Sequence, residues 1–195
     1  MRTPTLLVLV AVLAAAMVAL PMSGCGGGET QESEGTAETT ERDSEDSSTG
    51  TAPGQFPPEF ALEDLNGNTV TLADYEGQVV VIDLWATWCP PCREEIPFLV
   101  DLYEEHKDKG FVVLGIGLDQ GGADVLRKFA DENDVTYPVL VGDRAVSSDY
   151  RASSIPTTYI VGRDGRIVER HVGFSPAIGA ELREAVEQLL SPVEV

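Results

Sequence analysis

The residues most clearly suited to carry out a chemical reaction are two cysteines separated by two prolines, in the run Trp88-Cys89-Pro90-Pro91-Cys92. A segment with helical spacing follows at once, so both sulfurs are expected at the N-terminus of a helix. There the helix dipole and the free backbone N–H groups stabilise a thiolate. Cys89 is then the nucleophile that attacks a substrate disulfide, and Cys92 resolves the mixed disulfide by attacking Cys89. The pattern predicts dithiol–disulfide exchange through a redox-active disulfide, with no further cofactor.

Two other uses of the cysteine pair compete with disulfide exchange. A structural zinc site needs about four ligands. The third cysteine, Cys25, lies near the N-terminus, and His106 and His171 belong to different predicted elements, so no metal site is predicted. A purely structural disulfide also stays open. It is disfavoured because a bridge across two residues closes too small a loop to constrain the unfolded chain strongly.

Two acidic residues near the pair are candidates for moving protons. Asp83 lies in the middle of the apolar segment 79–85, where an ionised carboxylate is costly, so its pKa should rise. It could then exchange a proton with Cys92 near neutral pH. Glu95 follows Cys92 by three residues, and one helical turn places it on the same helix face. Each acid could instead be satisfied by solvent or by a neighbouring side chain.

The elements that must position these residues follow from the spacing of apolar side chains. Two short β-branched runs, 79–85 and 111–118, enclose a segment of helical spacing, which indicates a β-α-β unit. Taken over the whole chain, the pattern predicts strands at 60–62, 69–72, 79–85, 111–118, 137–141, 157–161 and 166–172, and helices at 91–107, 124–133 and 176–190. These elements predict an α/β fold with a central mixed β-sheet flanked by helices and an N-terminal β-hairpin.

The first 24 residues have the layout of a secretory signal peptide. Arg2 supplies positive charge, the segment from Leu6 to Leu20 is entirely apolar, and small residues follow. A bilayer-spanning helix needs about 20 apolar residues, so this shorter run favours a signal over a permanent transmembrane anchor. The four residues that end at Cys25 resemble the lipobox of bacterial lipoproteins, which implies lipid attachment at Cys25. The alternative is an unmodified thiol beside a cleaved signal.

Residues 25–55 have a different composition, dominated by Glu, Asp, Ser, Thr and Gly. Such a segment cannot bury enough apolar surface to offset its ordering entropy, so we expect a lipid-anchored, acidic, disordered tether. One folded domain at residues 56–195 would follow it. The formal net charge of −20 disfavours nucleic acid as a partner, because phosphate binding requires a basic face. Gly115 and Gly117 lack the third glycine of a dinucleotide site and indicate close backbone packing.

The run from Asp83 to Pro97 resembles the thioredoxin superfamily, and within it the TlpA/ResA-like membrane-tethered thiol-disulfide oxidoreductases. The resemblance spans residues 56–192 and rests also on Trp88, on Pro97 within the helix, and on the run 154–157 (SIPT). It implies a thioredoxin-like fold. In thioredoxins a buried acid occupies the place of Asp83, although many TlpA/ResA-like members have another polar residue there. Glu95 matches the acid near the active site of ResA-like proteins.

The resemblance also implies how substrate binds. In the family the proline of the second motif, here Pro156, is cis and packs beside the two sulfurs. The backbone of the preceding residue, here Ile155, pairs with an extended substrate segment, and Trp88 is expected to contact substrate too. Taken alone, Pro156 could be an ordinary proline at a strand start.

By resemblance, the protein is expected to reduce specific protein disulfides outside the cytoplasm, for example those of apocytochrome c. It would be a monomer, anchored to the cell membrane by its lipid and supplied with electrons by a membrane thiol carrier. The direction of electron flow does not follow from the sequence, because it depends on the stability of the Cys89 thiolate.

Two alternative functions stay open. The segment from Asn66 to Trp88 also resembles the redoxin and AhpC/TSA-related peroxiredoxin branch, whose members reduce peroxides. Those enzymes place Thr three residues before the reactive cysteine and a Pro upstream. Here Thr87 is two residues before Cys89, and no Pro lies between Pro58 and Cys89. A non-catalytic client-binding module is the other alternative, and the intact cysteine pair argues against it.

Overall fold

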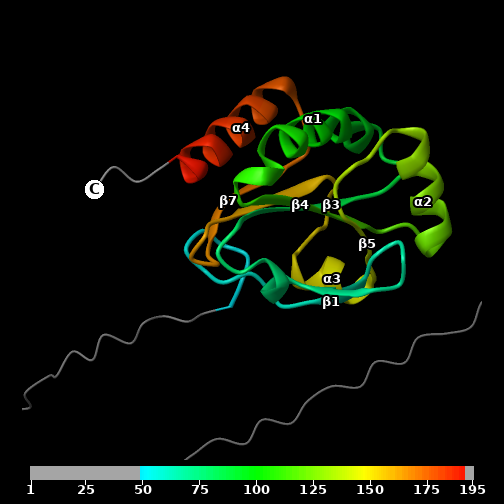
Figure 1. Ribbon diagram of the computed structural model, residues 1–195. Helices are drawn as coiled ribbons and strands as arrows, with labels where there is room; N and C mark the ends of the chain where they lie inside the picture. The colour runs from blue at the N-terminus through cyan, green and yellow to red at the C-terminus, as the bar shows by residue number, and fades with distance from the viewer. Residues whose placement is uncertain (1–48, 192–195) are drawn as a thin grey trace, which may run out of the picture. The chain divides into compact units, whose positions relative to one another are not determined.

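A run of apolar residues interrupted only by Asp83 forms β3 (Val79–Trp85), the central strand of a five-stranded sheet (Figure 1). Every residue of β3 is buried. Because side chains alternate along a strand, Val79, Val81 and Trp85 join one core cluster, and the intervening apolar residues join the other. Asp83 therefore points toward the same face of the sheet as Val81 and Trp85.

The computed structural model describes residues 49–191. The sheet has the order β5-β4-β3-β6-β7, in which β3, β4 and β5 are parallel and β6 and β7 are antiparallel to their neighbours. The mixed sheet predicted from the sequence is confirmed. The remaining elements are β1 (Ala61–Glu63), β2 (Thr69–Thr71), the 3-10 turn η1 (Leu72–Tyr75), α1 (Pro90–His106), the 3-10 turn η2 (Lys107–Lys109), β4 (Phe111–Gly117), α2 (Gly122–Glu132), β5 (Val139–Val141), α3 (Arg144–Asp149), β6 (Thr157–Val161), β7 (Ile167–Val172) and α4 (Pro176–Leu190).

Helices cover both faces of the sheet (Figure 1). On one face, apolar side chains of α1, α2 and α4 pack on β3 and β4 in a single core cluster. On the other face, Val146 of α3, Leu62 of β1 and the adjoining residues Tyr150 and Phe60 belong to a second cluster. The N-terminal β-hairpin is thus confirmed, with Leu62 paired to Val70. The helix that begins at the cysteine pair is held by the first of these clusters.

Several bounds differ from the predicted elements by one or two residues, and one α-helix was not predicted. Helix α3 was not predicted; it is six residues long, too short for a helical period to stand out, and begins where the Asp143 side chain accepts the Val146 N–H. Strand β5 begins at Val139 rather than at Tyr137, which precedes it with Pro138. Strand β4 ends at Gly117, where Leu126 packs so closely that an added Cβ would lie 2.3 Å from its side chain. Gly117 is therefore a site of close packing, as expected.

The residues just before the predicted domain are packed onto the sheet edge. The N–H of Gly54 donates to the carbonyl of Ile167 at 2.7 Å, and the N–H of Ile167 donates to the carbonyl of Gln55 at 2.9 Å. The Arg166 guanidinium lies over the ring of Phe56, 4.3 Å from its centroid. The folded unit therefore extends back into the end of the range predicted as tether.

The predicted signal peptide, Cys25 and the tether up to residue 48 lie outside the described residues. Between residues 49 and 191, none of the helices has the length and apolar character needed to cross a membrane.

Candidate active site

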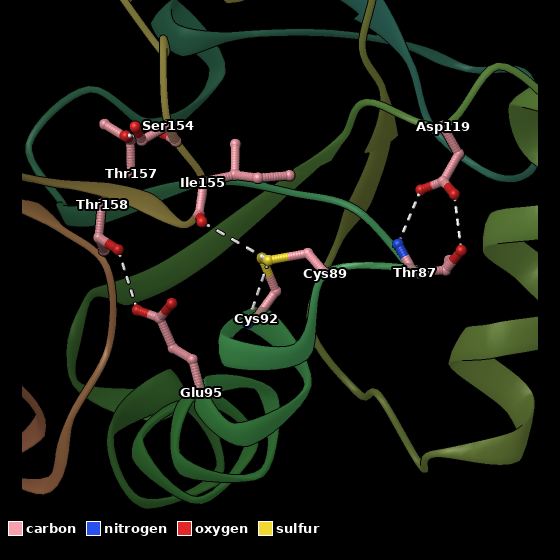
Figure 2. The surroundings of a disulfide bond; sticks show 9 residues. All are labelled: Thr87, Cys89, Cys92, Glu95, Asp119, Ser154, Ile155, Thr157 and Thr158. Carbon is pink, nitrogen blue, oxygen red and sulfur yellow. Dashed lines mark hydrogen bonds between the residues drawn. A yellow bond between two sulfur atoms is a disulfide. The ribbon is translucent and has the colours of Figure 1, made fainter.

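Cys89 and Cys92 are joined by a disulfide at the point where the chain leaves the β3 end of the sheet and enters α1 (Figure 2). Cys89 is the N-cap of α1, and its Sγ accepts the backbone N–H of Cys92 at 3.3 Å. Pro90 and Pro91 occupy the first helical positions, where a missing N–H costs the helix nothing. The predicted placement of both sulfurs at a helix N-terminus is confirmed.

This geometry distinguishes the two cysteines. Cys92 is fully buried, whereas 3% of Cys89 is exposed. When the disulfide is reduced, the Cys92 N–H and the positive end of the α1 dipole both stabilise negative charge on Cys89 Sγ. Cys89 is therefore the less completely buried cysteine and the one whose sulfur is stabilised as a thiolate.

The loop before β6 approaches Cys89 from the opposite side, as the resemblance implied. The Ile155–Pro156 peptide is cis, and the carbonyl oxygen of Ile155 lies 3.6 Å from Cys89 Sγ (Figure 2). In the disulfide this is a contact without a shared hydrogen, and it becomes a hydrogen bond when Cys89 is a thiol. The hydroxyl of Thr157 donates to the carbonyl of Ser154 at 2.6 Å and fixes the loop.

Trp88 is a large aromatic residue that is exposed to solvent at the site. Its side chain is 67% exposed, although it directly precedes the buried Cys89. An apolar ring of this size held in solvent marks a surface that a partner can cover. Trp88 is thus exposed beside the buried Cys89, and Ile155 is half-buried. Pro97, by contrast, lies within α1, one turn beyond Cys92 and away from the sulfurs.

A contact that the sequence did not reveal anchors the chain just before Cys89. The carboxylate of Asp119 accepts the backbone N–H of Thr87 at 2.9 Å and its hydroxyl at 2.6 Å (Figure 2). Asp119 follows β4, and the carboxyl ends of the parallel strands β3 and β4 meet at one edge of the sheet. Because residues that follow neighbouring parallel strands lie close together, the order of the predicted strands could have indicated the contact between Thr87 and Asp119. The contact also commits the Thr87 hydroxyl to Asp119, away from the role of a peroxidase threonine.

Both candidate acids are buried beneath the disulfide. Asp83 is fully buried, and neither of its carboxylate oxygens has a hydrogen-bond partner among the described residues. Burial raises the pKa of Asp83 well above its usual value, and the neighbouring charge of Glu95 raises it further. The predicted rise is confirmed.

Glu95 is also fully buried, so solvent does not satisfy it. One carboxylate oxygen of Glu95 accepts the hydroxyl of Thr158 at 2.9 Å (Figure 2). Burial raises the pKa of Glu95 to about 7, although the Thr158 hydrogen bond acts in the opposite direction. Thr158 is the β6 residue that pairs with Asp83 in the sheet. The fold thus brings Asp83 and Glu95 together on the face of the sheet beneath Cys92.

The histidines do not join the cysteine pair. The fold brings His106 near Glu105 of α1 and Glu187 of α4, a proximity that sequence spacing could not show. Two cationic side chains already contact this cluster. Arg183 lies 2.6 Å from the Glu105 carboxylate, and the Lys109 ammonium lies 3.2 Å from His106 Nδ1. We therefore assign it no metal. His171 forms a side-chain hydrogen bond with Glu169 on the edge strand β7.

Comparisons with known proteins agree with this site. Residues 53–170 match the model of the AhpC/TSA family. The chain is 38% identical over 125 residues to the thioredoxin-like protein YneN of Bacillus subtilis, covering 64% of this chain and 74% of that protein. It is 40% identical over 121 residues to the thiol-disulfide oxidoreductase ResA of Oceanobacillus iheyensis, covering 60% and 62%.

A solved structure shares the fold. It is a Chlorobium tepidum protein described as a candidate thiol:disulfide interchange protein DsbE, with a TM-score of 0.67 and 31% sequence identity. The match covers 72% of this chain and 99% of that one. The expected thioredoxin-like fold is therefore confirmed.

Proposed function

The chain belongs to the AhpC/TSA family and is a thiol-disulfide oxidoreductase of the ResA and DsbE type, and on this basis we propose that it reduces specific protein disulfides outside the cytoplasm. One observation carries the catalytic part of the proposal. Cys89 Sγ lies at the start of α1, with the Cys92 N–H at 3.3 Å on one side and the Ile155 carbonyl at 3.6 Å on the other. The N–H supports the thiolate of this sulfur, and the Ile155 backbone, which is the proposed docking segment, lies beside it.

The reaction has two exchange steps. In the reduced protein the Cys89 thiolate attacks one sulfur of the substrate disulfide, and the other substrate sulfur leaves as a thiolate that takes up a proton. The Cys92 sulfur then attacks Cys89 Sγ, the mixed disulfide breaks, and the second substrate thiolate leaves. Two electrons have passed to the substrate, and the protein is left with the Cys89–Cys92 disulfide seen in the structure.

The second step requires Cys92 to lose a proton although it is fully buried. Asp83 and Glu95 are the proposed acceptors. A general base works best when its pKa lies near the working pH, and Glu95, with a pKa of about 7, meets this condition. The same acids return the proton to Cys92 when the disulfide is reduced again.

Substrate recognition is proposed to use main-chain pairing. An extended segment of the client would pair with the backbone of Ile155, next to the cis Pro156, while the ring of Trp88 covers an apolar part of the client. Main-chain pairing is tolerant of sequence, so it does not by itself select one client. The identity of each client then depends on the surfaces around the pairing segment.

The cellular setting is proposed from the N-terminal sequence. The apolar run from Leu6 to Leu20 and the lipobox-like residues that end at Cys25 support export and lipid attachment. We propose a monomer tethered to the outer side of the cell membrane and re-reduced by a membrane thiol carrier. Apocytochrome c is the proposed client, by resemblance to the TlpA/ResA-like proteins.

Three cysteine variants test the reaction. Cys89→Ser should abolish reduction of insulin and apocytochrome c disulfides, whereas Cys92→Ser should accumulate a mixed disulfide that a non-reducing gel detects. Cys25→Ser is the matched control: it should keep full activity and lose only its membrane attachment. A parallel assay follows peroxide consumption. If Cys89→Ser kept wild-type disulfide reduction, or if peroxide were the faster substrate, the proposal would fail.

A further inference from the structure

Five buried polar atoms beneath the disulfide have no hydrogen-bond partner among residues 49–191. They are both carboxylate oxygens of Asp83, the second oxygen of Glu95, the indole nitrogen of Trp85 and the hydroxyl of Tyr137. Only one other such atom, on His106, is found in that part of the chain. Buried polar groups in native proteins are almost always paired, so a cluster of unpaired ones requires an explanation.

The glycine next to Asp83 explains how the two donors come together. Gly115 of β4 is the register partner of Asp83. A Cβ added at Gly115 would lie 2.8 Å from the ring of Tyr137 and 3.1 Å from the indole nitrogen of Trp85. Both aromatic side chains therefore occupy the space that a side chain at position 115 would fill, immediately beside Asp83.

The other side of Asp83 is occupied by Glu95. Thr158 of β6 pairs with Asp83 on the strand opposite β4, and its hydroxyl holds one oxygen of Glu95 at 2.9 Å. Asp83 thus lies between the second carboxylate on the β6 side and the two aromatic donors on the β4 side. Cys92 belongs to the same core cluster as Trp85 and Tyr137.

The charges around Asp83 make the donors important. Glu95 is the charged group that acts on Asp83, and no lysine or arginine of residues 49–191 offsets it. Tyr137 and Tyr103 are the other titratable side chains of this core cluster, because Cys89 and Cys92 do not titrate while they form a disulfide. The indole N–H can only donate and the hydroxyl of Tyr137 can donate, so these two groups complement the three free carboxylate oxygens.

We propose that Trp85 and Tyr137 form a closed hydrogen-bond network with Asp83 and Glu95, bridged by internal water, in which the Tyr137 hydroxyl donates toward the ionised Asp83. Internal water is stable where a buried site offers it about two to four polar partners, and the five unpaired atoms can provide them. Tyr137 is a positioning residue, because it acts on the acid pair and not on the sulfurs. Its effect on turnover rests on the proposed role of Asp83 and Glu95 as proton acceptors for Cys92.

Tyr103 provides a matched control within the same region. Tyr103 and Tyr137 meet edge to face with ring centroids 6.3 Å apart, and both line a surface depression of 350 Å³ below the N-terminal hairpin. Tyr103 has no atom among the unpaired buried groups. Tyr137→Phe and Tyr103→Phe therefore remove one hydroxyl each from neighbouring rings, but only the first removes a donor to the acid pair.

The direct test is a carbon-13 NMR titration of the Asp83 and Glu95 carboxyl groups in the full, oxidised chain. Tyr137→Phe removes a donor to the carboxylate, so the Asp83 titration should move to higher pH by about one pH unit. Tyr103→Phe should leave the wild-type curve unchanged. Gly115→Ala should reproduce the upward displacement, because its methyl group must push Tyr137 and Trp85 away from Asp83. A Tyr137→Phe curve that overlays the wild type, or moves to lower pH, would overturn the network.

Turnover separates this inference from the function on which it rests. In rapid mixing, Tyr137→Phe should slow the Cys92 step by up to about tenfold at pH values below the Asp83 titration and little above it, with the Cys89 attack unchanged. If the titration of Asp83 moved but the Cys92 step kept its wild-type pH profile, the network would stand and the proton-acceptor role of the acid pair would be refuted.

Discussion

Glu95→Gln should make the oxidised protein more stable at neutral pH. The variant keeps the size of the side chain and the oxygen that accepts the Thr158 hydroxyl, but it removes the buried charge. The pKa of Glu95 is raised from 4.5 to about 7 in the folded protein, so between these values the native state holds a proton that the unfolded chain has released. The stability of the wild type therefore falls as the pH rises through this window and levels off above it.

The size of the effect follows from the same values. A displacement of this size corresponds to about 3 kcal/mol of unfolding free energy at full ionisation. The side chain is fully buried, so solvent screening does not reduce it. Glu95→Gln should match the wild type near pH 4.5 and exceed its unfolding free energy by up to about 3 kcal/mol at pH 8. Burial of Asp83 adds a loss of the same sign, which the variant retains, whereas the part of that loss caused by the Glu95 charge disappears.

Urea unfolding of the oxidised chain at the two pH values measures this difference. Glu94→Gln is the matched control, because Glu94 is the exposed neighbour on the same helix and should change neither value appreciably. If Glu95→Gln were no more stable than the wild type at pH 8, Glu95 would not carry a buried charge, and its assignment as a base tuned to neutral pH would be wrong.

Three further variants probe the frame of the site. Asp119→Ala removes both hydrogen bonds to Thr87, so it should lower the unfolding free energy by about 1–3 kcal/mol and slow insulin reduction. Urea unfolding measures the first effect and turbidity the second. Wild-type behaviour in both assays would show that the loop before Cys89 needs no anchor. Gly117→Ala places a methyl group against Leu126 and should cost about 1–3 kcal/mol, which thermal unfolding detects, and an unchanged midpoint would contradict the close packing. Trp88→Ala should raise the KM for protein disulfides without lowering stability, since the ring is 67% exposed; an unchanged KM would exclude the ring from substrate contact.

The fold was predictable wherever apolar side chains carried its pattern. Strand β3 and helix α4 have the predicted bounds, because a strand buried on both faces leaves a short continuous apolar run and a helix packed on one side leaves an apolar stripe of helical period. Helix α3 has too few residues to show a period. Gly54 and Gln55 bind β7 through backbone hydrogen bonds. Every residue type can form such bonds, so the amino-acid composition does not indicate them, and the sequence predicts that these residues belong to the tether.

The site shows the same division between local and long-range features. The cysteines and the start of α1 are neighbours in sequence, so their chemistry could be predicted. Asp119 reaches Thr87 only because β3 and β4 are adjacent and parallel. The convergence of Trp85 and Tyr137 over Gly115 depends on strand register, which a single sequence does not specify.

The most direct test of the account is the pH dependence of alkylation of Cys89 in the reduced protein, in a Cys25→Ser background that removes the third thiol. Because the α1 N-terminus and the Cys92 N–H stabilise the thiolate, Cys89 should react first, with an apparent pKa clearly below about 8.5, the value of a free cysteine. Preferential alkylation of Cys92, or an apparent pKa for Cys89 at or above that of a free cysteine, would contradict the assignment of Cys89 as the nucleophile.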